Sequence, residues 1–185
     1  MLKILKKKND REEEEKKKAE EDAAAGGQPV GKKKVPGEIR LKKELLEIDL
    51  PSHARINYPD ENNIMKFEVL VDLTREDCLW KGAKYKFTVT VPPNYSHDPP
   101  KCHCDTTIYH PNIDLEGNVC LNILRKDWKP VLGINAVILG LLFLFIEPNP
   151  NDPLNHEAAE LMRNNENAFR DKVKRSLRGG NIDGY

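Results

Sequence analysis

The sequence predicts an α+β fold: one domain of catalytic size behind a polar N-terminal segment. Three observations support this class. Apolar and polar residues alternate over residues 65–73 and 84–91, as they do in antiparallel strands with one solvated face. Helical spacing precedes these strands over residues 37–48, and it follows them from residue 132 onward. Helices that lie before and after the strands, not between them, indicate an α+β arrangement.

Residues 1–34 are expected to form a flexible tail, and residues 35–185 the catalytic domain. Beyond its first five residues this segment is almost entirely Lys, Glu, Asp, Ala and Gly. A segment with so little apolar surface cannot offset its ordering entropy. The lysine run at 32–34 is interpreted as the solvated end of this linker, with a nuclear address or a polyanion patch as the alternative.

The first domain helix is predicted over residues 37–48. Its apolar residues Leu41, Leu45 and Ile48 recur at spacings of four and three, which places them on one face of a helix. The other side carries the basic residues Arg40, Lys42 and Lys43.

Two strands follow at residues 65–73 and 84–91, and a third is expected near residues 101–106. Turn-forming proline pairs at 92–93 and 99–100 separate the second strand from the third. Together these segments predict an antiparallel meander.

The apolar run at residues 132–146 predicts a buried helix. Asn135 and Gly140 interrupt it and Pro148 ends it, so it is shorter than the ~18 residues that suggest a membrane span. The proline-rich segment 148–153 must break any helix. Two helices are predicted after it, with apolar residues at Ala158, Leu161 and Met162 and at Ala168, Phe169, Val173 and Leu177, and with Gly179 and Gly180 as the stop.

The overall charge favours protein partners over nucleic acid or a membrane surface. Lysine plus arginine and aspartate plus glutamate each total 30, so no basic excess exists. The four cysteines follow no secretory signal, which indicates a reducing compartment and free thiols.

Cys120 is the candidate nucleophile. It lies eight residues after Asn112, in a loop whose turn contains Gly117. A thiolate is both a good acyl acceptor and a good leaving group, so it can hold an acyl chain and pass it to an amine. Asn112 can donate a hydrogen bond to the oxyanion that forms when the amine attacks, and one such donor can contribute ~3 kcal/mol.

A cysteine hydrolase is the alternative chemistry, and it requires a general base beside the thiol. His110 is the nearest histidine in the sequence, but Pro111 restricts its backbone to extended conformations. We therefore expect His110 to hold the loop through a backbone hydrogen bond.

Residues 109–124 resemble the active site of the ubiquitin-conjugating enzyme family, whose mark is His-Pro-Asn followed by a cysteine at this spacing. Three other segments agree with the family pattern: the proline-rich turn at 91–100, Trp128-Lys129-Pro130, and Pro-Asn-Pro-x-Asp-Pro-Leu at 148–154. The resemblance spans roughly residues 35–180. It implies a ubiquitin-conjugating fold, in which a four-stranded antiparallel meander is flanked by an N-terminal helix, a central helix and two C-terminal helices.

The resemblance also implies a role for each site residue. Cys120 is the thioester carrier, Asn112 is an oxyanion-binding or loop-stabilising amide, and His110 and Pro111 are structural residues of the loop. Asp152 is the carboxylate that positions and deprotonates the incoming lysine, whose pKa is ordinarily about 10.4. An alternative for Asp152 is the N-cap of a helix that begins near Pro153.

The sequence departs from the family pattern at two positions. Ser96 follows Tyr95 where many members have proline, which removes a possible cis-prolyl constraint. We expect this to change the rigidity of the turn and not the chemistry. Asn122 stands where ubiquitin-transferring relatives often have aspartate or serine.

Cys102-His103-Cys104 superficially resembles a metal site, but its spacing is wrong for zinc. On a strand the two cysteines share one face and His103 points away from it. We expect half-buried core cysteines and no metal, and we expect Cys78 to serve packing.

The tip of the tail suggests the neddylation branch of the family. Met1, Leu2, Ile4 and Leu5 form an apolar cluster on a polar segment, which is typical of a docking peptide. This tail resembles that of neddylation-branch conjugating enzymes, in which an acetylated initiator methionine enters a co-ligase pocket. The family tail often contains an aromatic residue, which this one lacks.

The branch implies the partners. They are a ubiquitin-like modifier, a heterodimeric activating enzyme that consumes ATP, a RING-type ligase with its co-ligase, and cullin substrates. No cofactor is expected on this chain, which has no phosphate-cradling Gly-rich motif. No nucleic-acid or membrane partner is expected, and the location expected is cytoplasm and nucleus.

Two surfaces are expected to bind these partners. The activating enzyme should dock on Arg40, Lys42 and Lys43 and on the apolar tip of the tail. The ligase should meet the turn at 92–98 and the loop around Pro130. Two alternatives to the neddylation function remain open. One is a carrier of ubiquitin or another modifier, and the other is a non-catalytic scaffold of the same fold.

Overall fold

The computed structural model describes residue 14 and residues 35–179. The predicted docking residues Met1, Leu2, Ile4 and Leu5 lie outside the described residues. The elements are, in order, α2 (Pro36–Glu47), β1 (Ala54–Asn57), β2 (Lys66–Asp72), β3 (Lys84–Thr90), β4 (Lys101–Cys104), the 3-10 helix η1 (Asn122–Leu124), α3 (Gly133–Ile146), α4 (His156–Asn164) and α5 (Glu166–Leu177).

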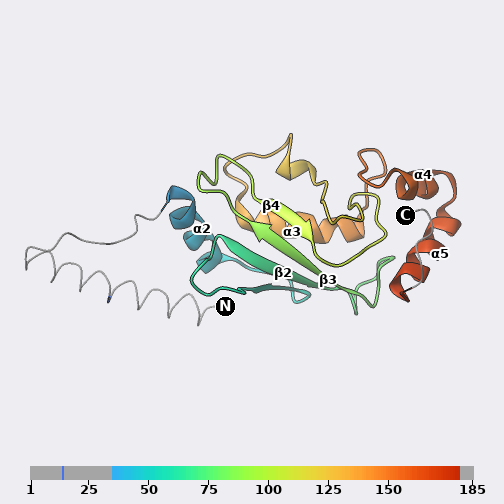
Figure 1. Ribbon diagram of the computed structural model, residues 1–185, viewed down its shortest axis with the longest axis horizontal. Helices are drawn as coiled ribbons and strands as arrows, with labels where there is room; N and C mark the ends of the chain where they lie inside the picture. The colour runs from blue at the N-terminus through green and yellow to red at the C-terminus, as the bar shows by residue number, and fades with distance from the viewer. Residues whose placement is uncertain (1–13, 15–34, 180–185) are drawn as a thin grey trace, which may run out of the picture.

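The four strands form one antiparallel sheet in the order β1-β2-β3-β4 (Figure 1). The register pairs Val69 with Phe87, and the inward residues of β2 and β3 alternate with outward ones as the sequence predicted. The residue pattern alone did not reveal β1, because its four residues contain too short an alternation. The fourth strand of the family fold is nevertheless present.

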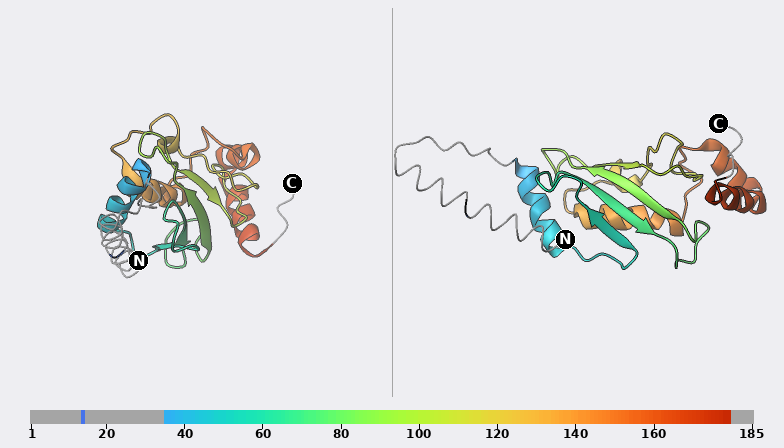
Figure 2. Two further views of the ribbon diagram at one scale, coloured as in Figure 1. Left: turned by 60° about the vertical axis from the view of Figure 1, so that its left-hand side comes forward. Right: turned by 60° about the horizontal axis from the view of Figure 1, so that its bottom comes forward.

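The core lies between the inner face of the sheet and α3. Phe145 of α3 stacks on Tyr85 with ring centroids 5.1 Å apart and meets the edge of Trp80 at 5.7 Å. α2 lies near one end of the molecule and the α4–α5 pair at the other (Figures 1 and 2). This arrangement confirms the predicted α+β class with a ubiquitin-conjugating topology.

α3 is only partly buried, which corrects the prediction of a buried helix. Eight of its residues are buried, but Leu139, Phe143 and Ile146 are 42%, 51% and 71% exposed. The helix covers the sheet with one side and leaves the other open. The sequence of α3 is apolar on all sides of the helix, so it does not show which side is buried and which is exposed. No helix among the described residues is long and apolar enough to cross a membrane.

Glu44 of α2 joins three parts of the fold. Its carboxylate accepts a hydrogen bond from the Tyr95 hydroxyl at 2.5 Å and one from the backbone N–H of Ile134 at 2.8 Å. The second bond satisfies a free N–H at the start of α3, where no local side chain forms a cap. Gly133, with φ of +67°, lets the chain approach Glu44 closely. Helix α2 is thus fixed to α3.

The alternative of Asp152 as a helix cap is wrong. Asn155 caps α4, since its side-chain oxygen accepts a hydrogen bond from the N–H of Ala158 at 3.0 Å. The N–H groups of Leu154 and Asn155 bond to the Pro111 carbonyl at 2.9 and 3.0 Å. These contacts hold the segment just before α4, and the helix begins at His156. Gly179, with φ of +72°, follows the end of α5, as predicted.

The peptide bond between Tyr95 and Ser96 is cis. Contacts on both sides hold the turn. The Trp128 indole donates to the Ser96 carbonyl at 2.9 Å, and the Tyr95 and Trp128 rings lie 6.0 Å apart.

Candidate active site

Cys120 is held by a short hairpin of the preceding loop. Its backbone N–H donates to the Asn112 carbonyl at 2.8 Å, and the Ile113–Val119 bridge continues the pairing. Asp114 closes the turn by accepting from the N–H of Asn118 at 2.8 Å. Gly117 has φ of +87°, and a side chain there would overlap the Cys104 carbonyl. The glycine therefore lets the hairpin pack on β4 and fixes the position of the thiol.

His110 makes two backbone hydrogen bonds. Its Nε2–H donates to the Leu144 carbonyl at 2.9 Å, and its Nδ1 accepts from the Asn112 N–H at 2.9 Å. The ring is fully buried, 4.5 Å from the Trp80 ring. Burial lowers the pKa of His110 to about 4, although the bond to Leu144 opposes the shift. The imidazole is therefore neutral, and both nitrogens are engaged away from the thiol.

The side chain of Asn112 connects the cysteine loop to the proline-rich loop. Its Nδ2 donates to the carbonyls of Asn149 at 2.7 Å and Asp152 at 3.2 Å, while its Oδ1 accepts from the Asn149 N–H at 2.8 Å. The residue is 2% exposed. An amide has two N–H donors, and both are used here by backbone carbonyls. The family resemblance implies either an oxyanion-binding or a loop-stabilising role for Asn112. These contacts are those of a loop-stabilising amide.

Three reactive side chains meet at the thiol. The Cys120 Sγ lies 3.8 Å from Asp152 Oδ2 and 3.1 Å from Arg125 Nη1, and Arg125 Nη1 lies 3.8 Å from the same carboxylate oxygen. Asp152 and Arg125 have side chains 45% and 53% exposed, so acceptor groups can reach them from solvent. Arg163 of α4 donates to the Pro150 carbonyl and ties down the Asp152 loop.

Arg125 was missed from the sequence as a site residue. A charged residue on a loop is usually solvated, so its residue type gave no signal. The turn of η1 returns the chain toward the thiol, and the Arg125 N–H bonds to the Asn122 carbonyl at 3.0 Å. A spacing of five residues after the cysteine gave no sign of this contact.

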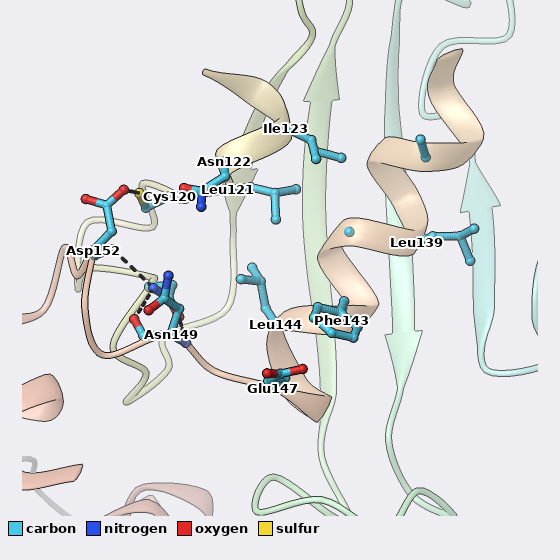
Figure 3. Close-up of a pocket in the computed structure, with 13 residues that line it drawn as sticks. Cys120, Leu121, Asn122, Ile123, Leu139, Phe143, Leu144, Glu147, Asn149 and Asp152 are labelled. Carbon is cyan, nitrogen blue, oxygen red and sulfur yellow. Dashed lines mark hydrogen bonds between the residues drawn. The ribbon is translucent and has the colours of Figure 1, made fainter. Parts of the chain in front are cut away.

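An apolar groove leads away from Cys120 (Figure 3). Its volume is about 530 Å³. One wall is the segment after Cys120 and the floor is the exposed side of α3, while Asn149 and Asp152 border the thiol end. Gly140 allows this closeness, because a Cβ there would lie 2.8 Å from the side chain of Leu121. Most of the surface that lines the groove is apolar.

The other cysteines belong to the core. Cys104 is buried and Cys102 half-buried, both on the inner face of β4, and burial raises the pKa of their thiols to about 11 and 12. Cys78 is half-buried against the core. Among the described residues, no group of three or more His, Cys, Asp or Glu side chains is placed to hold a metal ion.

The predicted partner surfaces adjoin one another. Arg40 and Lys43 are exposed on α2 and Lys42 is half-exposed. The N–H of Gly37, at the start of the same helix, donates to the Pro93 carbonyl at 3.0 Å. The bond from Trp128 to Ser96 brings the loop before Pro130 against the 92–98 turn. The basic helix face and both predicted ligase segments are therefore neighbours.

Comparisons with known proteins agree with the resemblance. The family model described as ubiquitin-conjugating enzyme matches residues 40–177. The NEDD8-conjugating enzyme Ubc12 of Dictyostelium discoideum is 50% identical over 151 residues, which is 82% of this chain and 65% of that protein, just under two thirds of its length. The protein of the same name from Arabidopsis thaliana is 50% identical over 152 residues, 82% of each chain. Among solved structures, S. cerevisiae Ubc12 matches with a TM-score of 0.75 and 38% identity over 94% of each chain.

Proposed function

The chain belongs to the ubiquitin-conjugating enzyme family, and we propose that it is the conjugating enzyme for NEDD8, carrying the modifier as a thioester on Cys120 and transferring it to lysines of cullins. As a member of this family it is a transferase. The observation that carries the proposal is the position of the Cys120 thiol, which lies at the end of an open apolar groove and 3.8 Å from the Asp152 carboxylate.

The groove suits the C-terminal segment of a ubiquitin-like modifier. A C-terminal carboxyl group that becomes the thioester must reach Sγ as the end of an extended chain, and the groove ends at Sγ. Leu139 and Phe143 offer apolar contact along its floor. Closing the groove over the tail also removes water from the thioester, which protects it from hydrolysis.

Transfer then follows from the side chains at the thiol. The free amine of a lysine attacks the thioester carbonyl carbon, whose π electrons move to oxygen, and a C–N bond forms. When the oxyanion collapses, the C–S bond breaks and the thiolate returns to Cys120. Asp152 orients the amine and accepts the proton that the new amide nitrogen loses. The half-exposed carboxylate is accessible to a lysine on another protein.

The hydrolase alternative lacks its base. A cysteine hydrolase needs a histidine that accepts a proton from the thiol. In this structure, His110 Nδ1 accepts from the Asn112 N–H and Nε2 donates to Leu144. The scaffold alternative is disfavoured because Cys120, Asp152 and the groove are all present and assembled.

The assignment to NEDD8 draws on the relatives' names and on the tail of this sequence. The proposed partners are a heterodimeric activating enzyme, which uses ATP so that this chain needs no cofactor, and a RING-type ligase with a co-ligase. The basic face of α2 serves the activating enzyme, and the 92–98 turn with the Pro130 loop serves the ligase. A protein that modifies cullins would work in cytoplasm and nucleus.

A charging assay tests the function. The full-length protein is incubated with ATP, the NEDD8-activating enzyme and NEDD8, or with ubiquitin and its own activating enzyme. We expect a reducible adduct with NEDD8 only, and none with Cys120→Ala. Charging by ubiquitin alone would support the thioester chemistry of Cys120 but reject NEDD8 as the modifier. Absence of any adduct would support the non-catalytic scaffold.

The same assay tests the docking surface. Replacement of both Lys42 and Lys43 by glutamate should lower the initial rate of charging about tenfold, because it reverses the charge of the α2 face. Lys174 and Arg175 are exposed neighbours on α5 at the far end of the molecule, and they give a matched control when both are replaced by glutamate. Unchanged charging by the Lys42 and Lys43 double variant would reject this surface.

A further inference from the structure

We propose that Arg125 is a catalytic residue: its guanidinium stabilises the negative charge that develops on the thioester oxygen and on the leaving Cys120 sulfur during transfer. The inference rests on the proposed function, since it needs an acyl group on Cys120. It assigns to Arg125 the donor role that the family resemblance offers to Asn112.

The Arg125 guanidinium lies beside the Cys120 sulfur. Its Nη1 lies 3.1 Å from the Cys120 Sγ, which is hydrogen-bond distance to sulfur. In a thioester the carbonyl oxygen is only two bonds from that sulfur. A small rotation of the half-exposed arginine side chain therefore brings an N–H to the oxygen, at the ~2.7–3.1 Å where donors stabilise an oxyanion.

The side-chain amide of Asn112 is already occupied. Both of its Nδ2 hydrogens point to the backbone carbonyls of Asn149 and Asp152, at 2.7 and 3.2 Å. A bond from Asn112 to the oxyanion would have to break one of these buried bonds. Leaving a buried carbonyl without a partner costs about 1–3 kcal/mol. Arg125 faces a smaller cost, because its side chain is 53% exposed and no buried carbonyl depends on it.

The positive charge of Arg125 also suits this role. A guanidinium offers five N–H donors in a planar fork and stays protonated throughout the pH range of the reaction. The hydrogen bond to Cys120, followed by the charges of Cys120 and Asp152, raises its pKa further. The guanidinium stays positively charged throughout the transfer. Its attraction to the thioester strengthens as the oxygen and then the sulfur become negative. Stabilisation that grows toward the transition state is the kind that raises the rate.

The electron and proton balance is that of the transfer itself. The amine forms the C–N bond, the carbonyl electron pair moves to oxygen beside Arg125, and its return expels the thiolate. The nitrogen proton goes to Asp152. Arg125 gives up no proton, so it acts by charge and hydrogen bonding alone.

The test is single-turnover discharge. Parent and variants are loaded with NEDD8, the activating enzyme is stopped, and loss of the thioester is followed after adding free lysine. Arg125→Gln should slow discharge about 30-fold, less than the ~100-fold or more that follows removal of a preorganised oxyanion donor, because the half-exposed arginine must first rotate to the oxygen. Arg125→Lys, which keeps the charge but loses the fork, should fall between. Lys126→Gln makes the same charge change on the next exposed residue and should discharge like the parent.

Two results would overturn the inference. One is discharge by Arg125→Gln within twofold of the parent. The other comes from a double-mutant cycle with Asp152→Asn, which detects an Arg125 that acts only by positioning the carboxylate 3.8 Å away. In that case Arg125→Gln would have no effect in the Asp152→Asn background. Independent roles predict that the two losses multiply.

A failure of the proposed function appears earlier and differently. If the parent forms no adduct with NEDD8 but charges with ubiquitin, the branch is wrong, and the Arg125 comparison proceeds with the ubiquitin thioester. If the parent forms no thioester with either modifier, the function and this inference both fall.

Discussion

The two sides of the Cys120 thiol differ in how firmly their residues are held. On the support side, His110 and Asn112 are 0% and 2% exposed, and every side-chain hydrogen bond they make is with backbone. On the reacting side, Asp152 and Arg125 are about half exposed and are joined by one contact of 3.8 Å. The support side therefore sets where the loops lie, and the reacting side remains free to meet a substrate.

This difference separates stability from activity. A buried side chain with backbone partners stabilises the fold, because its loss leaves those partners unsatisfied. An exposed ion pair adds little to stability, so its side chains are available for chemistry. Substitutions on the two sides should have opposite signatures, and four predictions test this.

The largest effect is expected on the reacting side. Asp152→Asn should slow discharge to free lysine about 100-fold, because general-base assistance to the amine is lost. The midpoint of urea unfolding should stay within experimental error of the parent. Asp127→Asn, an exposed aspartate on the neighbouring loop, is the control and should discharge normally. A large loss of stability in Asp152→Asn would show that this side chain supports the fold as well as the reaction.

On the support side, Asn112→Ala should lower the free energy of unfolding by about 2–3 kcal/mol. The change leaves the carbonyls of Asn149 and Asp152 and the N–H of Asn149 without their partners. Urea denaturation measures the effect, with the exposed Asn122→Ala as a control in the same region. If Asn112→Ala were as stable as the parent and only discharged slowly, Asn112 would act on the reaction and not on the loop.

The buried imidazole should make stability depend on pH. The pKa of His110 is about 4 in the folded protein and about 6.5 when unfolded, so the unfolded chain binds more protons between these values. Stability should fall as pH drops from 6.5 toward 4, by about 1 kcal/mol per pH unit. His110→Gln, which has no titrating ring, should be less stable at pH 7 but less sensitive to pH. Parallel pH curves for the two proteins would exclude this role for His110.

The smallest effect concerns a support residue far from the thiol. Glu44→Gln should destabilise the protein by about 1 kcal/mol, because charge-assisted bonds to Tyr95 and to the start of α3 become neutral ones. Glu47→Gln, exposed at the end of the same helix, is the matched control for thermal unfolding. Discharge should be unchanged in both. Slower discharge by Glu44→Gln would show that the bond from Glu44 to α3 also affects the groove that α3 lines.

The sequence by itself determined the element types and the place of the nucleophile. Period-two and helical spacings depend only on neighbouring residues, and they located α2, β2, β3, β4 and the C-terminal helices within a few residues. The short β1 had too little pattern to be seen. The His-Pro-Asn segment placed Cys120, and the restricted backbone before Pro111 correctly anticipated a backbone hydrogen bond from His110.

Only the tertiary structure decided which side chains meet at the thiol. Asp152 comes to Cys120 from 32 residues away, Asn112 binds the carbonyl of a residue 40 positions on, and Glu44 reaches Ile134 across 90 residues. The turn of η1 directs Arg125 to the sulfur, and the sheet decides which side of α3 stays exposed. Each depends on the packing of distant segments, and the physical reason is that local spacing carries no information about distance through space.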